Sequence, residues 1–88
     1  MSAKRFVVRG RVQGVNFRAA AAEQARRLGL TGRIWNRADG AVEVEAYGDL
    51  PSLAAFERWL HRGPAFADVA GVEAIELAGA PRHGFTIE

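Results

Sequence analysis

The chain of 88 residues is long enough for one small domain and too short for two. A chain of this length buries only about 60–65% of the surface that its unfolded form exposes, so its core must be small. Hydrophobic residues make up 49% of the chain and charged residues 25%, a balance that excludes disordered and fibrous proteins. The net charge of +2 is too small to indicate a nucleic-acid partner by itself. The absence of cysteine excludes disulfides, thiolate metal ligands and thiol nucleophiles.

No stretch of the chain approaches the roughly 20 apolar residues that a membrane-spanning helix needs. Residues 1–9 hold one short apolar run, which Arg9 interrupts and which is too short for the core of a signal peptide. We therefore expect a cytoplasmic protein that does not bind membranes. We also expect residues 1–88 to form a single domain that acts as a monomer.

The first part of the chain predicts a strand, a short loop and a helix. Residues 5–12 alternate between two sets of side chains with the period of a strand. Residues 17–28 carry an apolar stripe at helical spacing, which consists of Phe17, Ala21, Ala25 and Leu28. Asn16 is expected to cap the start of this helix, and Gly29 is expected to follow its end.

A hairpin is predicted next. Residues 31–36 form its first strand and residues 41–47 its second, and the loop 37–40 between them ends in Asp-Gly, a pair typical of hairpin turns. The second strand alternates cleanly, with Val42, Val44 and Ala46 expected to face inward and Glu43, Glu45 and Tyr47 expected to face outward.

A second helix and a further strand follow the hairpin. The helix is predicted to start at residues 48–51, with Pro51 tolerated in its first turn, and to stop at residues 63–64. Its buried stripe is expected to consist of Leu53, Phe56 and Leu60. Residues 69–77 are expected to form a strand with a bulge near Ala70.

Residues 84–88 are a possible fifth strand, with Phe85 and Ile87 pointing inward. The predicted order β-α-β-β-α-β favours an α+β fold, a ferredoxin-like two-layer sandwich whose mainly antiparallel sheet carries both helices on one face. The other face meets water. We expect the charged residues there to pair across strands, and these are Arg9, Arg11, Arg33, Glu43 and Glu45.

The segment between the first strand and the first helix has the composition of an anion-binding loop. It consists of Gly10-Arg11-Val12-Gln13-Gly14-Val15-Asn16-Phe17-Arg18. Backbone N–H groups at a helix start lack partners within the helix, and N–H groups around a glycine can form a concave site for phosphate oxygens. Arg18 adds a permanent charge and a planar fork of donors. From these residues alone, a tight turn at Gly14 beside a solvated Arg18 is an equal alternative.

Asn36 ends the second predicted strand. It has the parity of Ile34, so its side chain should project to the helix-covered side of the sheet, where the loop before the first helix can also lie. An asparagine there can hold a water through its carboxamide oxygen while its NH2 group donates elsewhere. A turn-forming role beside Asp39-Gly40 is a strong alternative for Asn36.

Together, these segments closely resemble the acylphosphatase family. The resemblance rests on Gly-Arg-Val-Gln-Gly-Val-x-Phe-Arg at 10–18, Leu-Gly-Leu-x-Gly at 28–32, Asn36, Asp39-Gly40 and Val42-Glu43. It covers residues 5–48 densely, and beyond them it rests on the order of the elements and on a Phe-containing last strand. The combination is far more specific than either glycine motif alone.

The resemblance implies hydrolysis of the carboxyl–phosphate bond of acyl phosphates to a carboxylate and inorganic phosphate, with no metal, cofactor or covalent phosphoenzyme. In such enzymes an arginine and loop amides hold the phosphoryl group and an asparagine positions the attacking water, which implies Arg18 and Asn36 as the catalytic residues here. The implied phosphate-binding residues are Gln13, Gly14, Val15, Asn16, Phe17 and Arg18. Inorganic phosphate or sulfate is expected to bind at the same site.

Three positions depart from the commonest pattern of this family. Arg33 stands where an aromatic residue is frequent, Trp35 stands where a basic residue is frequent, and Asn16 occupies a variable position that is often aromatic or small. We expect these departures to affect the surface that faces the substrate and the rate, rather than the pair of Arg18 and Asn36.

Two other functions remain open. RNA-recognition modules share this strand order but place stacking aromatic residues on the open sheet face, where this chain is expected to present Glu43 and Glu45, so we expect no nucleic-acid partner. The other alternative is a non-catalytic regulatory domain that keeps the anion-binding loop. The two histidines, His61 and His83, are not expected to make a metal site, and Trp59 on the second helix is expected to be a packing residue.

Overall fold

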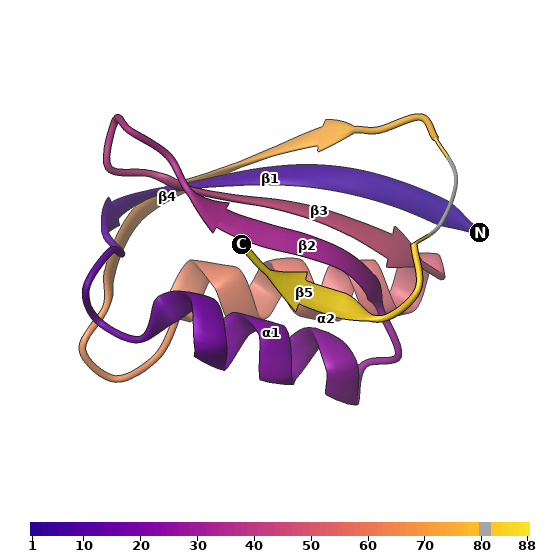
Figure 1. Cartoon of the computed structure of the whole chain (residues 1–88), viewed down its shortest axis with the longest axis horizontal. Coiled ribbons are helices and arrows are strands. Elements are labelled where there is room, and N and C mark those ends of the chain that lie inside the picture. The colour runs from indigo at the N-terminus through magenta and orange to yellow at the C-terminus, as the bar shows by residue number, and fades with distance from the viewer. Residues whose placement is uncertain (80–81) are drawn as a thin grey trace.

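The computed structural model describes residues 1–79 and 82–88, and in these ranges the chain forms a sheet with two helices on one face (Figure 1). The elements in chain order are β1 Ser2–Arg11, α1 Phe17–Arg27, β2 Thr31–Asn36, β3 Val42–Gly48, α2 Leu50–Arg62, β4 Asp68–Glu76 and β5 Phe85–Ile87. Their types and order confirm the prediction, including the fifth strand. β1 starts at Ser2 rather than at Arg5, because residues 2–4 continue the pairing of β1 with β3.

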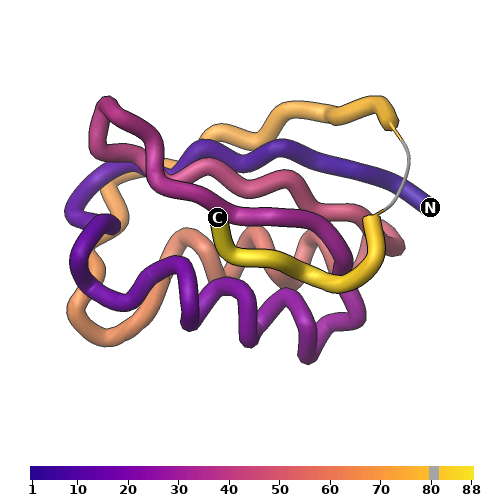
Figure 2. The backbone as a smooth tube through the Cα atoms, in the orientation of Figure 1, coloured from indigo at the N-terminus to yellow at the C-terminus, as the bar shows by residue number. Residues whose placement is uncertain are grey.

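The strands are arranged in the order β4-β1-β3-β2-β5. β1 pairs antiparallel with both β3 and β4, and β2 pairs antiparallel with β3. The last strand, β5, runs parallel to β2 and lies beside it in the backbone trace of Figure 2. Because both helices lie on the same side of this sheet, the structure confirms the predicted ferredoxin-like two-layer sandwich.

The hydrophobic core lies between the sheet and the helices, and its centre is aromatic. The ring of Phe56 meets the rings of Phe6 and Phe85 nearly edge-on, with centroid separations of 5.9 and 6.3 Å. Phe17, the first residue of α1, is also fully buried and lies 5.8 Å from the ring of Trp59, which confirms the packing role expected for that tryptophan. Burial of one such side chain stabilises a fold by about 1.5–3 kcal/mol, so Phe17 holds the start of α1 firmly against the core.

The structure agrees fully with the sequence prediction at the end of α1 but only in part at its start. Gly29 follows the helix with a φ of 74°, as predicted for the residue after a helix. Asn16 stands at the predicted N-cap position, but its side chain makes no capping hydrogen bond. The reason is its left-handed backbone conformation, with a φ of 65°, because a capping side chain reaches the helix from an extended conformation.

A bulge interrupts the pairing of β1 with β4. Arg9 opposes Gly71 and the next residue, Gly10, opposes Val69, so Ala70 is the extra residue and the predicted bulge is confirmed. Gly10 has a φ of 125°, and a Cβ on it would lie 2.3 Å from a backbone oxygen of β4. Only glycine fits at this point of the bulge.

Two side chains on the open face of the sheet are less exposed to solvent than the alternating sequence pattern predicted. Glu45 and Tyr47 lie on this face but are each only 8% exposed. Arg5 in β1 and Arg33 in β2 both stand opposite Glu45 and donate to its two carboxylate oxygens over 3.2 and 2.8 Å. The expectation that these side chains meet water was wrong because alternation determines the face of a side chain and not what covers it.

The ion pairs on the open face agree only in part with the prediction. Arg33 pairs with Glu45 as expected. Arg9 pairs instead with Glu73 over 3.0 Å, because β4 lies beside β1, and with Asp39 of the hairpin loop over 3.4 Å. Several of the charged side chains on the open face are therefore paired.

The row of Arg5, Glu45 and Arg33 predicts a pH-dependent contribution to stability. Burial opposes ionisation of Glu45, but hydrogen bonds from Arg33 and Arg5 outweigh it and lower the pKa of this carboxyl below its ordinary value of 4.5. A carboxyl with a lowered pKa stabilises the fold above its unfolded-state pKa, and this stabilisation is lost as the pH falls through the folded-state pKa. We therefore expect Glu45→Gln to lower the free energy of unfolding by about 1.5–3 kcal/mol at neutral pH.

The difference in free energy of unfolding between the unchanged protein and Glu45→Gln should shrink as the pH is lowered below 4.5, because the protonated carboxyl then resembles the amide of the variant. Urea denaturation of both proteins at pH 7 and pH 3 measures it. Equal differences at the two pH values would contradict the assignment to Glu45.

Candidate active site

The β1–α1 loop, residues 12–16, turns the chain sharply from the sheet into the first helix. Gly14 and Asn16 both have left-handed backbone conformations, with φ values of 75° and 65°. The helical hydrogen bonding starts with the N–H of Ala20, which donates to the carbonyl of Asn16 over 3.2 Å. The N–H groups that precede Ala20 in the first turn therefore lie outside the helical ladder, and the side chain of Asn16 caps none of them.

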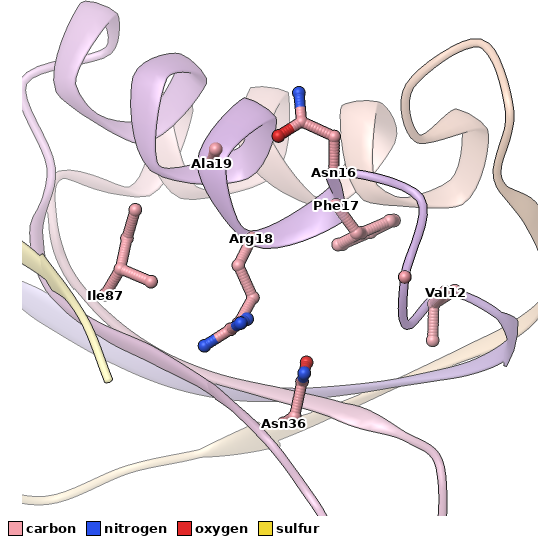
Figure 3. Close-up of a pocket in the computed structure, with 8 residues that line it drawn as sticks. Val12, Asn16, Phe17, Arg18, Ala19, Asn36 and Ile87 are labelled. Atoms are coloured by element: carbon pink, nitrogen blue, oxygen red, sulfur yellow. The ribbon is translucent and has the colours of Figure 1, made fainter.

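A pocket of about 190 Å³ opens at this end of the sheet. Its lining consists of Val12, Gly14, Asn16, Phe17, Arg18, Ala19, Asn36 and Ile87. In Figure 3, the side chain of Arg18 extends from the first turn of α1 toward the sheet, and Asn36 projects from the end of β2 toward it. The structure thus brings Arg18 and Asn36 into one pocket.

Arg18 is held in place by residue 88. Its Nη1 donates to the main-chain oxygen of Glu88 over 2.6 Å, and the N–H of Glu88 donates to the carbonyl of Ile34 in β2 over 2.8 Å. This chain of contacts ties the guanidinium to the strand that also carries Asn36. No aspartate or glutamate side chain of the described residues lies within ion-pair distance of Arg18, and α1 has no acidic residue in its first turn.

Two of the residues predicted to bind phosphate do not line the pocket. The carboxamide of Gln13 is turned toward the hairpin between β2 and β3, where it donates to the carbonyls of Arg37 and Ala41. Val15 packs against the hydrophobic core. Contacts from the backbone N–H groups of Gln13 and Val15 to a phosphoryl group stay a prediction.

The pocket also contains residues that the sequence did not indicate. Ala19 follows Arg18 in the first turn, so the argument from unpaired N–H groups at a helix start could have found it. Ile87 points to the helix side of the sheet as predicted, but it is 43% exposed and lines the pocket instead of being buried. It reaches the pocket because β5 lies parallel to β2, a pairing that no local sequence signal indicates.

The departures at Arg33 and Trp35 lie away from the pocket. Arg33 pairs with Glu45, and its guanidinium carbon lies 4.5 Å from the ring centroid of Trp35. Neither residue lines the pocket. Asn16, the third departure, does line the pocket, and an effect of Arg33 and Trp35 on the rate stays a prediction.

Neither α1 nor α2 has the length and apolar character that a membrane-spanning helix needs. Within residues 1–79 and 82–88, no group of three or more His, Asp or Glu side chains is arranged to hold a metal ion. His61 lies in the last turn of α2, and both histidines are exposed.

The family model described as acylphosphatase matches residues 4–87. The chain belongs to the acylphosphatase family. The acylphosphatase of Alkalilimnicola ehrlichii is 44% identical over 84 residues, which cover 96% of this chain and 94% of that protein. The acylphosphatase of Xanthomonas euvesicatoria pv. vesicatoria is 48% identical over 85 residues, 97% of each chain. The crystal structure of acylphosphatase from Bacillus subtilis superposes with a TM-score of 0.96 at 35% identity and covers 100% of this chain and 99% of that one.

Membership of the acylphosphatase family establishes the reaction. The chain is a hydrolase that cleaves acyl phosphates, as its sequence motifs implied. The pocket at the start of α1 is the candidate place for this reaction, because it combines unpaired backbone donors with an arginine that has no acidic partner among the described side chains.

Two glycines allow a matched test of the loop. Gly14 and Gly29 have φ values of 75° and 74°, and a Cβ on either would meet no atom within 4 Å. Replacement by alanine should therefore strain both positions similarly, by about 1–2 kcal/mol. Only Gly14→Ala should also lower kcat/KM, by about tenfold or more, because only Gly14 lines the pocket and small displacements there misplace the reacting groups.

Thermal unfolding and steady-state kinetics with benzoyl phosphate measure the two effects separately. Gly29→Ala is the control for strain without a change in the pocket. An equal loss of activity in the two variants would mean that strain alone, rather than the geometry of the loop, governs the rate.

Proposed function

We propose that the acyl phosphate is hydrolysed in the pocket between the β1–α1 loop and the end of β2. The phosphoryl group is held by backbone N–H groups of residues 13–18 and by the guanidinium of Arg18, and the attacking water is oriented by Asn36. The observation that carries this proposal is that Arg18 and Asn36, which are 18 positions apart in the sequence, line one small pocket together with the first turn of α1.

The first turn of α1 supports anion binding in two ways. Its N–H groups lie outside the helical ladder, and the helix dipole places positive partial charge at this end. Arg18 adds a full charge, and its planar fork can donate to two phosphoryl oxygens at once. Since one N–H group of Arg18 already donates to Glu88, the guanidinium is oriented before the substrate arrives.

Asn36 lies on the sheet side of the pocket, opposite the helix. Its carboxamide oxygen can accept a hydrogen bond from the water that attacks phosphorus. In an in-line displacement the water and the leaving oxygen lie on opposite sides of phosphorus, so the acyl group departs away from β2. The new bond joins the water oxygen to phosphorus, while the bond between phosphorus and the carboxyl oxygen breaks and the carboxylate leaves with its electron pair.

The proton of the water passes to a phosphoryl oxygen of the substrate. Among the described residues that line the pocket there is no histidine, aspartate or glutamate that could take it. The leaving carboxylate is a weak base and needs no proton as it departs, so hydrolysis proceeds through positioning and electrostatic stabilisation alone.

Arg18 and Asn36 should differ in the kinetic constant that their loss affects. Arg18→Gln should abolish both turnover and competitive inhibition by inorganic phosphate, because it removes the charge that binds the anion. Asn36→Ala should lower kcat by about 10²–10³, as the loss of one preorganised polar group does, and should leave the Ki for phosphate nearly unchanged.

Arg11→Gln is the matched control, because Arg11 ends β1 just before the loop and lies outside the pocket. Circular dichroism verifies that each variant is folded. Near-normal turnover in folded Asn36→Ala would remove Asn36 from the mechanism.

The pH dependence tests the route of the proton. Because no histidine, aspartate or glutamate is among the described residues that line the pocket, kcat should be nearly constant between about pH 6 and 8, the range in which a histidine would change charge. Measurement of kcat across this range with benzoyl phosphate decides the point. A bell-shaped profile centred near the ordinary histidine pKa of about 6.5 would require a side-chain base instead.

The cytoplasmic location, the monomeric state and the organisation of residues 1–88 as one domain stay predictions from the sequence. RNA binding finds little support in the arrangement of charges, because Arg5 and Arg33 on the open face are both paired with Glu45. We retain inorganic phosphate or sulfate as the expected ligand of the pocket.

A further inference from the structure

We propose that the side chain of Gln13 sets the position of Asn36 relative to Arg18 and is therefore a positioning residue for hydrolysis. The inference rests on the function proposed above, because it assumes that Asn36 orients the water. The observation behind it is a contact that plays no part in the mechanism proposed above. The side chain of Gln13 bridges the β1–α1 loop and the hairpin loop between β2 and β3, residues 37–41.

Gln13 makes this bridge with a single nitrogen atom. Its Nε2 donates to the main-chain oxygen of Arg37 over 2.8 Å and to that of Ala41 over 2.9 Å. The two hydrogens of the carboxamide NH2 group match the two acceptors. Gln13 is half-buried, so solvent competes only partly for these hydrogen bonds.

The two carbonyls flank the position of Asn36 in the sheet. Arg37 directly follows Asn36, and Ala41 directly precedes Val42, which is the partner of Asn36 in the register of β2 with β3. On its other side, β2 pairs with β5 only as far as Ile34. The end of β2 is therefore held by β3 and by the carboxamide of Gln13.

The bridge is not needed to close the hairpin. The carbonyl of Ala41 already accepts the N–H of Arg37 over 2.8 Å, and the carbonyl of Arg37 accepts the N–H of Gly40 over 3.3 Å. Because the hairpin has its own hydrogen bonds, Gln13 contributes something else, which is the placement of the hairpin against the loop.

Among the hydrogen bonds of the described residues, these two alone join the β1–α1 loop to the hairpin loop. The ion pair of Arg9 with Asp39 also reaches the hairpin loop, but it starts from β1 and is longer, at 3.4 Å. Gln13 thus belongs to the loop that is proposed to bind phosphate. Its side chain contacts the hairpin loop that directly follows Asn36, the residue proposed to orient the water.

Loss of the bridge should therefore lower turnover more than binding. Gln13→Met keeps a chain of similar length but has no donors. We expect it to reduce kcat by about 10–100-fold, since a misplacement near 1 Å can cost a factor of this size. The Ki for inorganic phosphate should stay nearly unchanged, because the loop N–H groups and Arg18 remain.

Asp39→Ala is the matched control within the same hairpin. It removes the hydrogen bond from the N–H of Ala41 to Asp39 Oδ1, at 3.1 Å, and the ion pairs of Asp39 with Arg9 and Arg37, but keeps the donor and both acceptors of the bridge from Gln13. We expect both variants to lower Tm and only Gln13→Met to lower kcat. A change in Tm alone for Gln13→Met, with kcat retained, would reduce Gln13 to a structural residue and overturn the proposal.

Should Gln13→Met fail to fold, Gln13→Asn provides the same test, because it keeps the amide on an arm that is one methylene too short to reach both carbonyls. Kinetics are measured well below the Tm of each protein. Retention of the full kcat by folded Gln13→Asn would also overturn the proposal.

A double-mutant cycle separates this inference from the mechanism on which it rests. If Gln13 acts through Asn36, the double variant of Gln13→Met with Asn36→Ala should lose about as much kcat as Asn36→Ala alone. Losses that multiply would overturn the role of Gln13 and leave that of Asn36 intact. Unchanged kcat in Asn36→Ala would instead refute the proposed function, and the role of Gln13 with it.

Discussion

The site depends on the N–H groups at the start of α1. These groups have no acceptor within the helix. Every helix has such groups, and most are capped by a side chain or face water. Here Asn16 does not cap them, because its left-handed backbone turns the side chain away, while Phe17 holds the first turn against the core. The result is a set of donors that stays in place without a ligand, beside an arginine oriented by Glu88.

Much of this arrangement could be predicted from the sequence, because it follows from local periodicity. The spacing of Phe17, Ala21 and Ala25 predicted α1, and the shared parity of Ile34 and Asn36 predicted that Asn36 projects to the helix side, where it does line the pocket. What could not be predicted depends on partners far away in the sequence. Ile87 reaches the pocket through a parallel pairing, and no local signal indicates which carbonyls the side chain of Gln13 meets.

The two faces of the sheet have separate roles. On the helix side, side chains pack into an aromatic core and form the pocket at one end. On the open face, charges pair in rows across the strands, as Arg5 and Arg33 do around Glu45. Because alternate residues of one strand serve the two faces, Arg33 and Trp35 contact each other away from the pocket, which lies on the other side of the same strand.

The contact of Arg18 with Glu88 joins residues that are 70 positions apart. During synthesis on the ribosome, β1, α1 and β2 emerge well before β5, so a nascent chain can form the loop while its arginine still lacks the main-chain oxygen that orients it. The contact that orients this arginine therefore forms late, once β5 has paired with β2.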